Sequence, residues 1–292
     1  MIKRQHRPIQ VISAANRGGV GKTTTAIIAY TAMMADGREP RLIEVERSHE
    51  RVFERLLKSM AVTGDQILHV DLPEASTYAD DPAQTRALFT KVFEVLETNE
   101  DAVVDLAAGA TLELLAAAKA ADHADFVRDR GANIVLLACC TADDVTSWGG
   151  AKQAVDAFRQ AYPHGDAIVV ICRVRGARGA EGARKVLEEQ GVTRFIEVPE
   201  HTSRVMTHMY GRSGISPHKI LQHYDPPNTT EESKKRLRQE LQQELGSGSL
   251  AEAGLDLKAF RDWYVNVLHS FTLAVIGDPP EGPTEAPKPG AS

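Results

Sequence analysis

Residues 8–25, PIQVISAANRGGVGKTTT, carry the strongest structural signal in this chain. An apolar run over residues 9–15 leads into a glycine-rich turn, and a lysine and three threonines follow the turn. This order predicts a buried strand, a loop that wraps around phosphate groups and the first turn of a helix. The P-loop pattern G-x-x-x-x-G-K-[ST] is met from Gly21 onward, with Asn16 in place of its first glycine. An ordinary glycine turn before a helix is the alternative, but the full order of residues favours a nucleotide site.

The residue types in the turn indicate how a nucleotide would be held. Glycine lacks a Cβ, so main-chain N–H groups can close around phosphate oxygens at the positive end of the helix. Lys22 would bring positive charge to the β and γ phosphates, and the Thr23 hydroxyl would be a ligand of Mg²⁺. The expected cofactors are therefore a nucleoside polyphosphate and Mg²⁺, and the residues of the turn do not distinguish ATP from GTP. The predicted nucleotide-binding residues are Gly18, Gly19, Val20, Gly21, Lys22, Thr23 and Thr24.

Composition limits the possible domain organisation, binding partners and cellular compartment. The chain has 292 residues, 42% of them hydrophobic, which is enough for one large α/β domain or two smaller ones, and one is favoured. The formal net charge of −6 excludes a wholesale polycation, so contact with nucleic acid would need a local basic patch. The three cysteines match neither a disulfide framework nor metal-ligand spacing, and no run approaches the ~18 apolar residues of a membrane span. We expect a soluble, cytoplasmic protein without membrane contact.

Short apolar runs separated by helical segments predict the rest of the core. Strands that alternate with helices pair in parallel, and runs that are apolar on both faces fit a sheet covered on both sides. The predicted fold class is α/β, a doubly wound, mostly parallel sheet with helices on both faces as in P-loop NTPases, plus C-terminal helices. The candidate strands are residues 41–45, 66–70, 102–106, 133–139, 167–172 and 194–198, and the candidate helices are residues 24–35, 49–60, 82–99 and 144–162.

We expect three parts along the chain. Residues 1–224 would form the P-loop ATPase core, residues 225–276 a C-terminal helical extension packed on that core, and residues 277–292 a disordered tail rich in proline and glycine. In the extension, a charged helix over residues 230–245 precedes an apolar stripe at helical spacing over residues 257–276. Packing of this stripe onto the sheet is favoured over a surface that docks a partner.

Acidic residues stand at the ends of two predicted strands. Glu44 and Glu46 are two positions apart and so share a face of their strand, where they would meet Mg²⁺ or the attacking water. A solvated acid is an equally good interpretation of Glu44, whereas a catalytic role is favoured for Glu46. Asp105 ends an apolar strand in the form of a Walker B segment, whose carboxylate holds Mg²⁺ directly or through water.

These motifs resemble the ParA and MinD superfamily of deviant Walker A ATPases. The family signature K-G-G-x-G-K-[ST] is similar to residues 17–23, RGGVGKT. The family strand that ends in D-x-D resembles residues 44–46, EVE, and its Walker B segment resembles residues 105–109, DLAAG. A late strand that ends in proline resembles residues 195–199, and the similarity spans residues 8–222.

The resemblance implies an ATP hydrolase that acts as a dimerisation switch, in which ATP binding closes a homodimer and hydrolysis opens it. Arg17 takes the place of the signature lysine that reaches the phosphates of the other subunit. Arg17, Lys22 and Glu46 are the implied catalytic set. Turnover would be slow and stimulated by a DNA-bound adaptor protein. The implied roles are plasmid or chromosome partitioning, plasmid stability and conjugative DNA transfer.

A basic run after the strand at residues 167–172 bears on nonspecific DNA binding. It is a glycine-containing loop that enters a helix, and such a loop can follow a phosphate backbone without contacting bases. Plain solubilisation is an equally good interpretation. The candidate DNA contacts are Arg173, Arg175, Arg178, Arg184 and Lys185. A second basic run, residues 234–238, is surrounded by glutamates and is interpreted as a salt-bridged helix face.

An alternative of a different class is a P-loop enzyme of the same superfamily that uses ATP to modify a small-molecule carboxylate. Such an enzyme needs a substrate pocket with its own acid or base, and the sequence offers no compact His or Lys constellation near a strand end. His201 and His208 share a helical spacing, but solvated histidines are the default interpretation. Cys139 and Cys140 are neighbours on a strand, so they should point to opposite faces and be buried structural residues.

Overall fold

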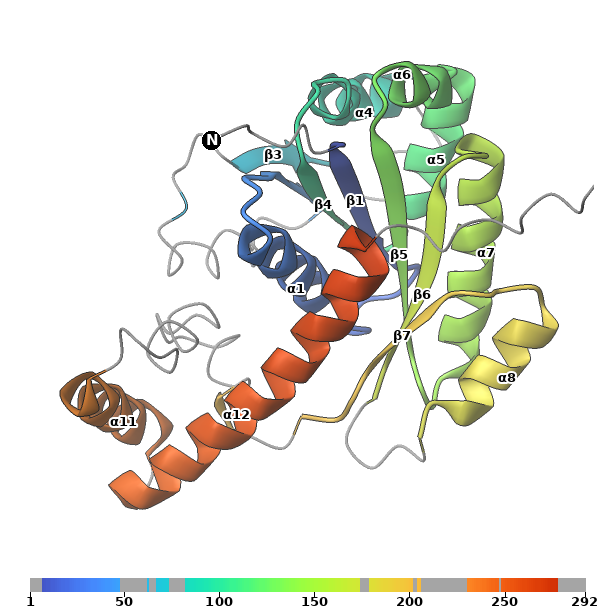
Figure 1. The fold of residues 1–292 in the computed structure, drawn as a ribbon. Coiled ribbons are helices and arrows are strands. Elements are labelled where there is room, and N and C mark those ends of the chain that lie inside the picture. Colours follow the sequence, from blue (N-terminus) through green and yellow to red (C-terminus); the bar gives the residue numbers. More distant parts are fainter. Residues whose placement is uncertain are drawn as a thin grey trace, which may run out of the picture.

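The computed structural model describes residues 7–47, 62, 67–73, 82–173, 179–201, 204–205, 230–246 and 248–277. Within these residues seven strands form one sheet in the order β3-β2-β4-β1-β5-β6-β7 (Figure 1). All six pairings are parallel, as the predicted fold class requires. The strands are β1 (Ile9–Ala14), β2 (Arg41–Glu46), β3 (Ile67–Asp71), β4 (Ala102–Leu106), β5 (Asn133–Thr141), β6 (Asp166–Cys172) and β7 (Phe195–Val198).

Helices cover both faces of the sheet, and each face has its own apolar core (Figure 1). The first core is covered by α1 (Lys22–Ala35) and α12 (Leu250–Phe271), and α11 (Glu231–Leu245) packs against α12. The second is covered by α4 (Pro82–Leu96), α5 (Thr111–Ala120), α6 (His123–Asp129), α7 (Val145–Ala161) and α8 (Glu181–Glu189). The doubly wound architecture is therefore confirmed.

Successive residues of the central strands point into opposite cores. In β1, Val11 belongs to the core under α1 and Ile12 to the opposite core, and the neighbouring strand β4 repeats this with Val103 and Val104. All four side chains are inaccessible to solvent. Burial on both sides explains why these strands appear in the sequence as short continuous apolar runs.

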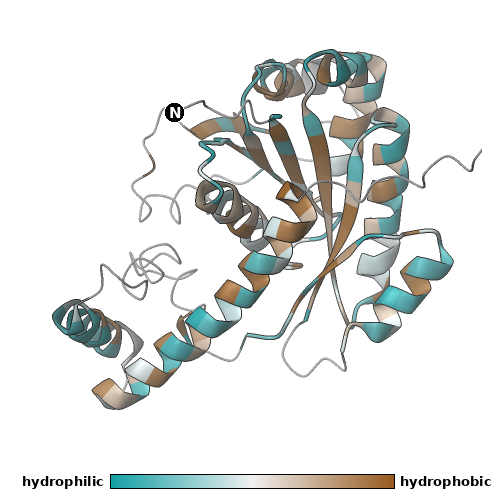
Figure 2. Ribbon diagram, in the orientation of Figure 1, coloured by the Kyte–Doolittle hydropathy of each residue, from teal (hydrophilic) through white to brown (hydrophobic). Residues whose placement is uncertain are grey.

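The long helix α12 fastens the C-terminal part of the chain to the first core. The Tyr264 hydroxyl donates to Thr31 Oγ1 of α1 at 3.0 Å, and Trp263 Nε1 donates to the Pro199 carbonyl at 2.8 Å. Figure 2 shows apolar residues along α12 interleaved with hydrophilic ones. The apolar stripe thus packs onto the core, as predicted. The helix begins earlier than predicted, because the Ser249 side chain accepts a hydrogen bond from Glu252 N and so caps its first turn.

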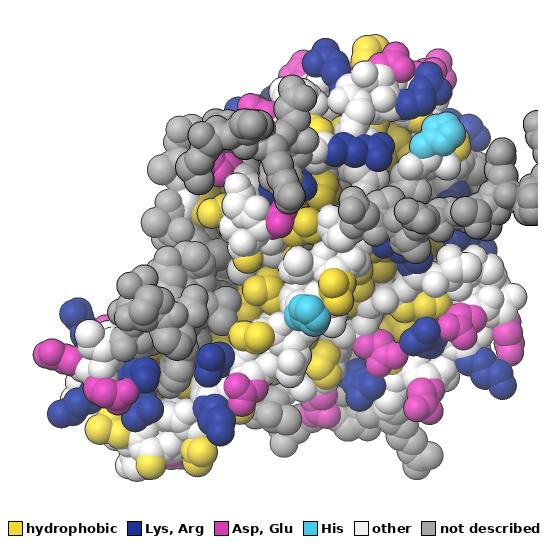
Figure 3. Space-filling model, in the orientation of Figure 1, with side chains coloured by type: hydrophobic (Ala, Val, Ile, Leu, Met, Phe, Trp, Pro, Cys, Tyr) yellow, Lys and Arg dark blue, Asp and Glu magenta, His cyan; other side chains and the backbone are white. Residues whose placement is uncertain are grey.

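The charged helix α11 presents mixed charges to solvent. Lys234 pairs with Glu231 at 2.8 Å, and Arg236 pairs with Glu240 at 3.3 Å. Figure 3 shows basic and acidic side chains side by side at this end of the molecule. The interpretation of the second basic run as a salt-bridged face is confirmed.

Every predicted strand matches a strand of the structure to within two residues at each end. The helix predicted at residues 49–60 and residues 278–292 of the predicted tail lie outside the described residues. In the described part of the chain, none of the helices is both long enough and apolar enough to span a bilayer.

Candidate nucleotide-binding site

The glycine-rich loop lies between β1 and α1 at the edge of the sheet formed by the carboxyl ends of the strands. Gly19 and Gly21 have φ values of 76° and 92°, which residues with a Cβ rarely adopt. Gly21 is constrained further, since a Cβ at this position would lie 2.8 Å from Cys172 Sγ. The Ser13 hydroxyl donates to the Lys22 carbonyl at 2.9 Å and ties the far end of the loop back to β1. The loop conformation therefore requires glycine at these two positions.

Among the described residues, the loop is open at the start of α1. A Cβ at Gly18 or Gly19 would meet no described atom within 4 Å, whereas Val20 is buried and anchors the loop. The N-cap residue Gly21 has no side chain to cap α1, and the first turn carries no acidic residue, so the first N–H groups and the positive helix end face this opening in the described part of the chain. Lys22, Thr23 and Thr24 occupy this first turn and are half-buried. The arrangement suits an anion with several oxygens, such as a polyphosphate.

Thr23 and Asp105 come together beneath the loop. The Thr23 hydroxyl donates to Asp105 Oδ2 at 2.8 Å, across two elements that are 82 positions apart in the chain. Asp105 is only 1% exposed, and its Oδ1 atom has no hydrogen-bond partner in the described part of the chain. Burial raises the pKa of Asp105 to about 7, against the lowering effects of Lys22 and the Thr23 hydrogen bond. A buried carboxylate with a vacant lone pair beside a hydroxyl fits Mg²⁺, which needs few protein ligands when phosphates supply the rest.

Two further acids stand next to Asp105. The register pairs Glu44 of β2 with Asp105 on one side and with His69 of β3 on the other. Glu44 is fully buried, and its Oε2 atom lies 3.1 Å from His69 Nδ1, so the interpretation of Glu44 as a solvated acid is wrong. Glu46 is half-buried at the end of β2, and both glutamates raise the pKa of Asp105. The three carboxylates concentrate negative charge where a cation would bind.

Arg17 forms an ion pair within its own chain. Its Nη1 atom lies 2.7 Å from Asp144 Oδ2, and the two side chains are 57% and 32% exposed. Asp144 also caps α7, because its side chain accepts a hydrogen bond from Thr146 N. Asn16 makes a second link to α7 by donating to the Gly150 carbonyl at 3.3 Å. Two neighbouring side chains at the start of the loop thus connect it to α7 and its N-cap.

The candidate DNA contacts are brought together only in part. Arg173 Nη2 donates to Glu197 Oε2 at 2.9 Å, and Arg184 Nε donates to Glu188 Oε1 at 2.8 Å. Lys185 is exposed, and no ion pair of Lys185 is found in the part of the chain that the structure describes. Arg175 and Arg178 lie outside the described residues. Two of the three candidate DNA contacts that the structure describes are therefore paired with glutamates.

The cysteines are structural, as predicted. Cys139 lies in the core under α1 and Cys140 in the opposite core, and both are buried. Burial raises the pKa of the Cys139 thiol to about 11, so the thiol stays protonated at neutral pH. In the described residues no group of three or more His, Cys, Asp or Glu side chains could hold a metal ion by itself.

Sequence reasoning missed the residues that support the loop from elsewhere in the chain. Asp144 is 127 positions from Arg17, and no local pattern marks the pair. His69 lies within an apolar run of the sequence, yet it is the second residue before Asp71 at the end of β3 and lies beside Glu44 in the sheet. The alternation of side chains along β2 and β3 could have placed His69 on the same face as Glu44.

Comparison with known proteins gives structural neighbours only. No family model matches the chain, and no curated protein matches it. The fold is similar to that of a plasmid partition protein from Borrelia burgdorferi (13% identity, 70% of this chain and 93% of that chain, TM-score 0.42). It is also similar to the MinD cell division protein of Aquifex aeolicus (17% identity, 75% and 91%, TM-score 0.43). A third similar structure is cobyrinic acid a,c-diamide synthase from Mycobacterium smegmatis with bound ADP and magnesium (14% identity, 66% and 86%, TM-score 0.40).

Proposed function

We propose that this chain is an ATP-dependent dimerisation switch of the ParA and MinD kind, with a role in plasmid or chromosome partitioning, plasmid stability or conjugative DNA transfer. The observation that carries the proposal is the hydrogen bond between Thr23 and the buried Asp105 directly beneath an open glycine loop. A hydroxyl and a carboxylate in this position are what a Mg²⁺ nucleotide requires of a P-loop protein.

Each residue of the site has a proposed role. Main-chain N–H groups of the loop bind the phosphates, and Lys22 adds a positive charge close to them. Thr23 and Asp105 hold Mg²⁺, which when bound offsets the charge of the phosphates and of the neighbouring acids. Glu46, half-buried at the end of β2, positions the water that attacks the terminal phosphate. Hydrolysis is slow in the isolated chain and faster with a DNA-bound adaptor.

Arg17 has the proposed role of reaching the phosphates in a second copy of the chain. Its guanidinium is exposed at the loop mouth, and its present partner Asp144 forms an ion pair of the kind that contributes at most about 1 kcal/mol. Phosphates of a second copy would compete well for this side chain, since guanidinium groups bind phosphate through paired hydrogen bonds. Arg17 thus pairs with Asp144 in the monomer and with the phosphates of the second copy in the dimer.

Sedimentation velocity of the full chain with Mg²⁺ tests the switch. We expect dimers with ATP or AMPPNP and monomers with ADP, and Lys22→Ala should abolish the difference by abolishing nucleotide binding. Arg17→Ala should lose the dimer and keep nucleotide binding. Arg41→Ala is the matched control, because Arg41 is also exposed and forms a surface ion pair with Glu100. An oligomeric state that is the same with ATP and ADP rejects the switch.

Nonspecific DNA binding by the ATP dimer is the second part of the proposal. Lys185 is an exposed cation in the middle of α8 for which no ion pair is found among the described residues, and the dimer would present two copies of this surface. Gel shifts over a range of salt concentrations test this. Lys185→Glu should weaken binding to all sequences alike and reduce the salt dependence. Equal retardation of the wild type with ATP and with ADP would contradict a nucleotide-controlled DNA surface.

A second candidate function has one observation in its favour. The pair of His69 and Glu44 lies on the same sheet face as Asp105, and a histidine paired with a carboxylate is a common acid or base group. An enzyme that uses ATP to modify a small-molecule carboxylate would need such a group. Formation of ADP that depends stoichiometrically on a carboxylate substrate, and that His69→Ala abolishes, would favour this function over the switch.

A further inference from the structure

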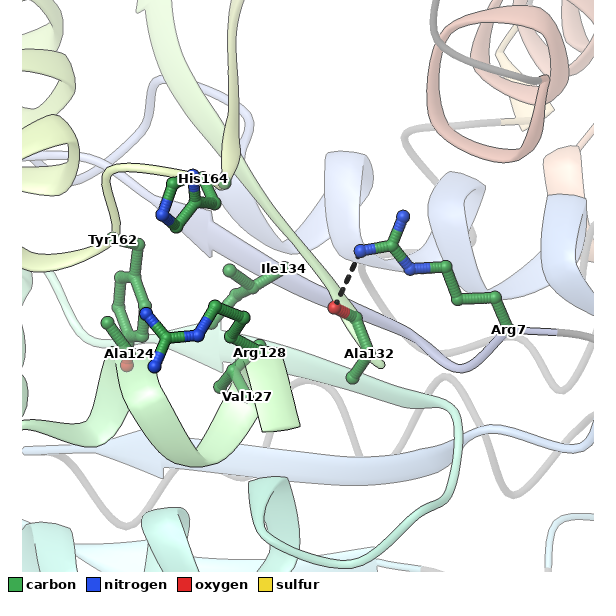
Figure 4. Close-up of a pocket in the computed structure, with 9 residues that line it drawn as sticks. Arg7, Ala124, Val127, Arg128, Ala132, Ile134, Tyr162 and His164 are labelled. Carbon is green, nitrogen blue, oxygen red and sulfur yellow. Dashed lines mark hydrogen bonds between the residues drawn. The ribbon is translucent and has the colours of Figure 1, made fainter. Parts of the chain in front are cut away.

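A small cavity, partly open to solvent, lies at the edge of the sheet opposite the glycine loop (Figure 4). It is bounded by α6, by the residue that precedes β6 and by the segments that lead into β1 and β5. The strands are parallel, so these starting ends are separated from the nucleotide site by the length of the strands. The cavity is therefore distinct from the candidate nucleotide site.

Arg7 brings a fixed positive charge to this cavity. Its Nε atom donates to the Gly131 carbonyl at 2.7 Å and its Nη2 atom donates to the Ala132 carbonyl at 3.3 Å. Figure 4 shows the guanidinium directed at Ala132. Carbonyl oxygens orient a guanidinium without neutralising it, and no ion pair of Arg7 is found within the described ranges. The charge of Arg7 thus remains available to an anion.

The main chain of Arg7 is also held in place. The Arg7 carbonyl accepts a hydrogen bond from Arg38 Nη1 at 3.1 Å. The Arg38 side chain is only 7% exposed and pairs with Asp36 and Asp101, each at 2.9 Å. A buried and paired arginine is a rigid support, so Arg7 is oriented before any ligand arrives.

The inner wall of the cavity is apolar. Val127 and Ile134 are buried. The Tyr162 hydroxyl is hydrogen-bonded to His123 Nδ1 at 2.9 Å, so Tyr162 contributes its ring to the cavity wall. The two other nitrogen-bearing side chains of the lining are Arg128 and His164. Arg128 is 56% exposed and pairs with Asp125 at 2.9 Å and with Asp129 at 3.6 Å, so it contributes less charge than Arg7.

We propose that this cavity binds a small organic anion, with its carboxylate or phosphate on Arg7 and its apolar body against Val127, Ile134 and the Tyr162 ring. None of the described residues that line the cavity is acidic, and guanidinium groups match carboxylate and phosphate oxygens. The cavity is partly open to solvent, so the ring of a bound anion can lie against the apolar wall with its outer edge in water. The site functions independently of ATP binding.

Binding of four probes to the full chain tests this proposal. Benzoate and phenyl phosphate combine an anion with a ring, whereas inorganic phosphate lacks the ring and benzyl alcohol lacks the charge. Ligand-detected NMR titrations should give binding of the first two and much weaker binding of the others. Arg7→Gln should weaken the binding of benzoate and phenyl phosphate about tenfold, the effect of losing a charged hydrogen bond.

Two variants and one competitor complete the test. Arg159→Gln is the matched control, because Arg159 also donates to a glycine carbonyl, that of Gly191, but lies outside the cavity lining, and it should leave binding unchanged. Ala124→Leu should fill the cavity and weaken both ring-bearing probes while Arg7 stays in place. Saturating ATP with Mg²⁺ should displace neither probe. The proposal is overturned if neither anion binds, if Arg7→Gln binds them as well as the wild type does, or if ATP displaces them.

Discussion

Replacing Asp105 by asparagine should stabilise the nucleotide-free chain at high pH, although it removes a proposed metal ligand. Burial raises the pKa of Asp105 to about 7 in the folded chain, while an unfolded chain has an aspartate pKa near 3.9. The folded chain therefore binds this proton more tightly, and the free energy of unfolding falls as the pH rises from the unfolded to the folded pKa. At about 1.4 kcal/mol for each pKa unit, the full loss is about 4 kcal/mol.

Asparagine has the shape of aspartate, can still accept the Thr23 hydroxyl through its amide oxygen and cannot ionise. The stability difference between Asp105→Asn and the wild type should thus grow with pH, by about 2–3 kcal/mol between about pH 5 and about pH 8.5. Urea unfolding at both pH values, without Mg²⁺ or nucleotide, measures it. Mg²⁺ with ADP should then stabilise the wild type more than the variant.

An exposed carboxylate provides the control for this experiment. Asp129 on α6 is 74% exposed, and Asp129→Asn should change stability by less than about 1 kcal/mol at either pH. A difference between Asp105→Asn and the wild type that stays constant over the pH range would refute the argument, because it would mean that Asp105 does not titrate in this environment.

Three further variants test other parts of the structure. Asp144→Asn should cost less than about 1 kcal/mol in urea unfolding and should increase ATP-dependent dimerisation by releasing Arg17; unchanged sedimentation would count against the release. Gly21→Ala should destabilise the chain by about 2 kcal/mol through its positive φ and its approach to the Cys172 thiol, and Cys172→Ala should recover only part of this loss in thermal unfolding. Tyr264→Phe should lower stability by about 1 kcal/mol through loss of its hydrogen bond to α1, and a neutral result would mean that this bond contributes nothing.

The fold and the loop could be predicted because their signals are local. An apolar strand, a glycine turn and the start of a helix follow one another in the printed sequence, and each buried strand is one short apolar run. The contact between Thr23 and Asp105 spans 82 positions and was predictable only because a P-loop requires such a partner on a strand. The P-loop motif, and not any local sequence pattern, predicted this long-range pair.

The rest depends on register and on packing between distant segments. His69 pairs with Glu44 because β3 lies beside β2 in one particular alignment, and the sequence does not contain that alignment. Arg7 reaches the carbonyls before β5 across more than 120 positions, so its cavity had no signal in the sequence. Such sites follow from the assembled fold and not from any one segment.

Binding of a magnesium nucleotide by the glycine loop can be measured by isothermal titration calorimetry of the full chain. We expect Mg²⁺ with ATP to bind at one site per chain, removal of Mg²⁺ to weaken this binding, and Lys22→Ala to abolish it. Absence of binding to the wild-type chain, or equal binding to Lys22→Ala, would show that the loop is not a nucleotide site.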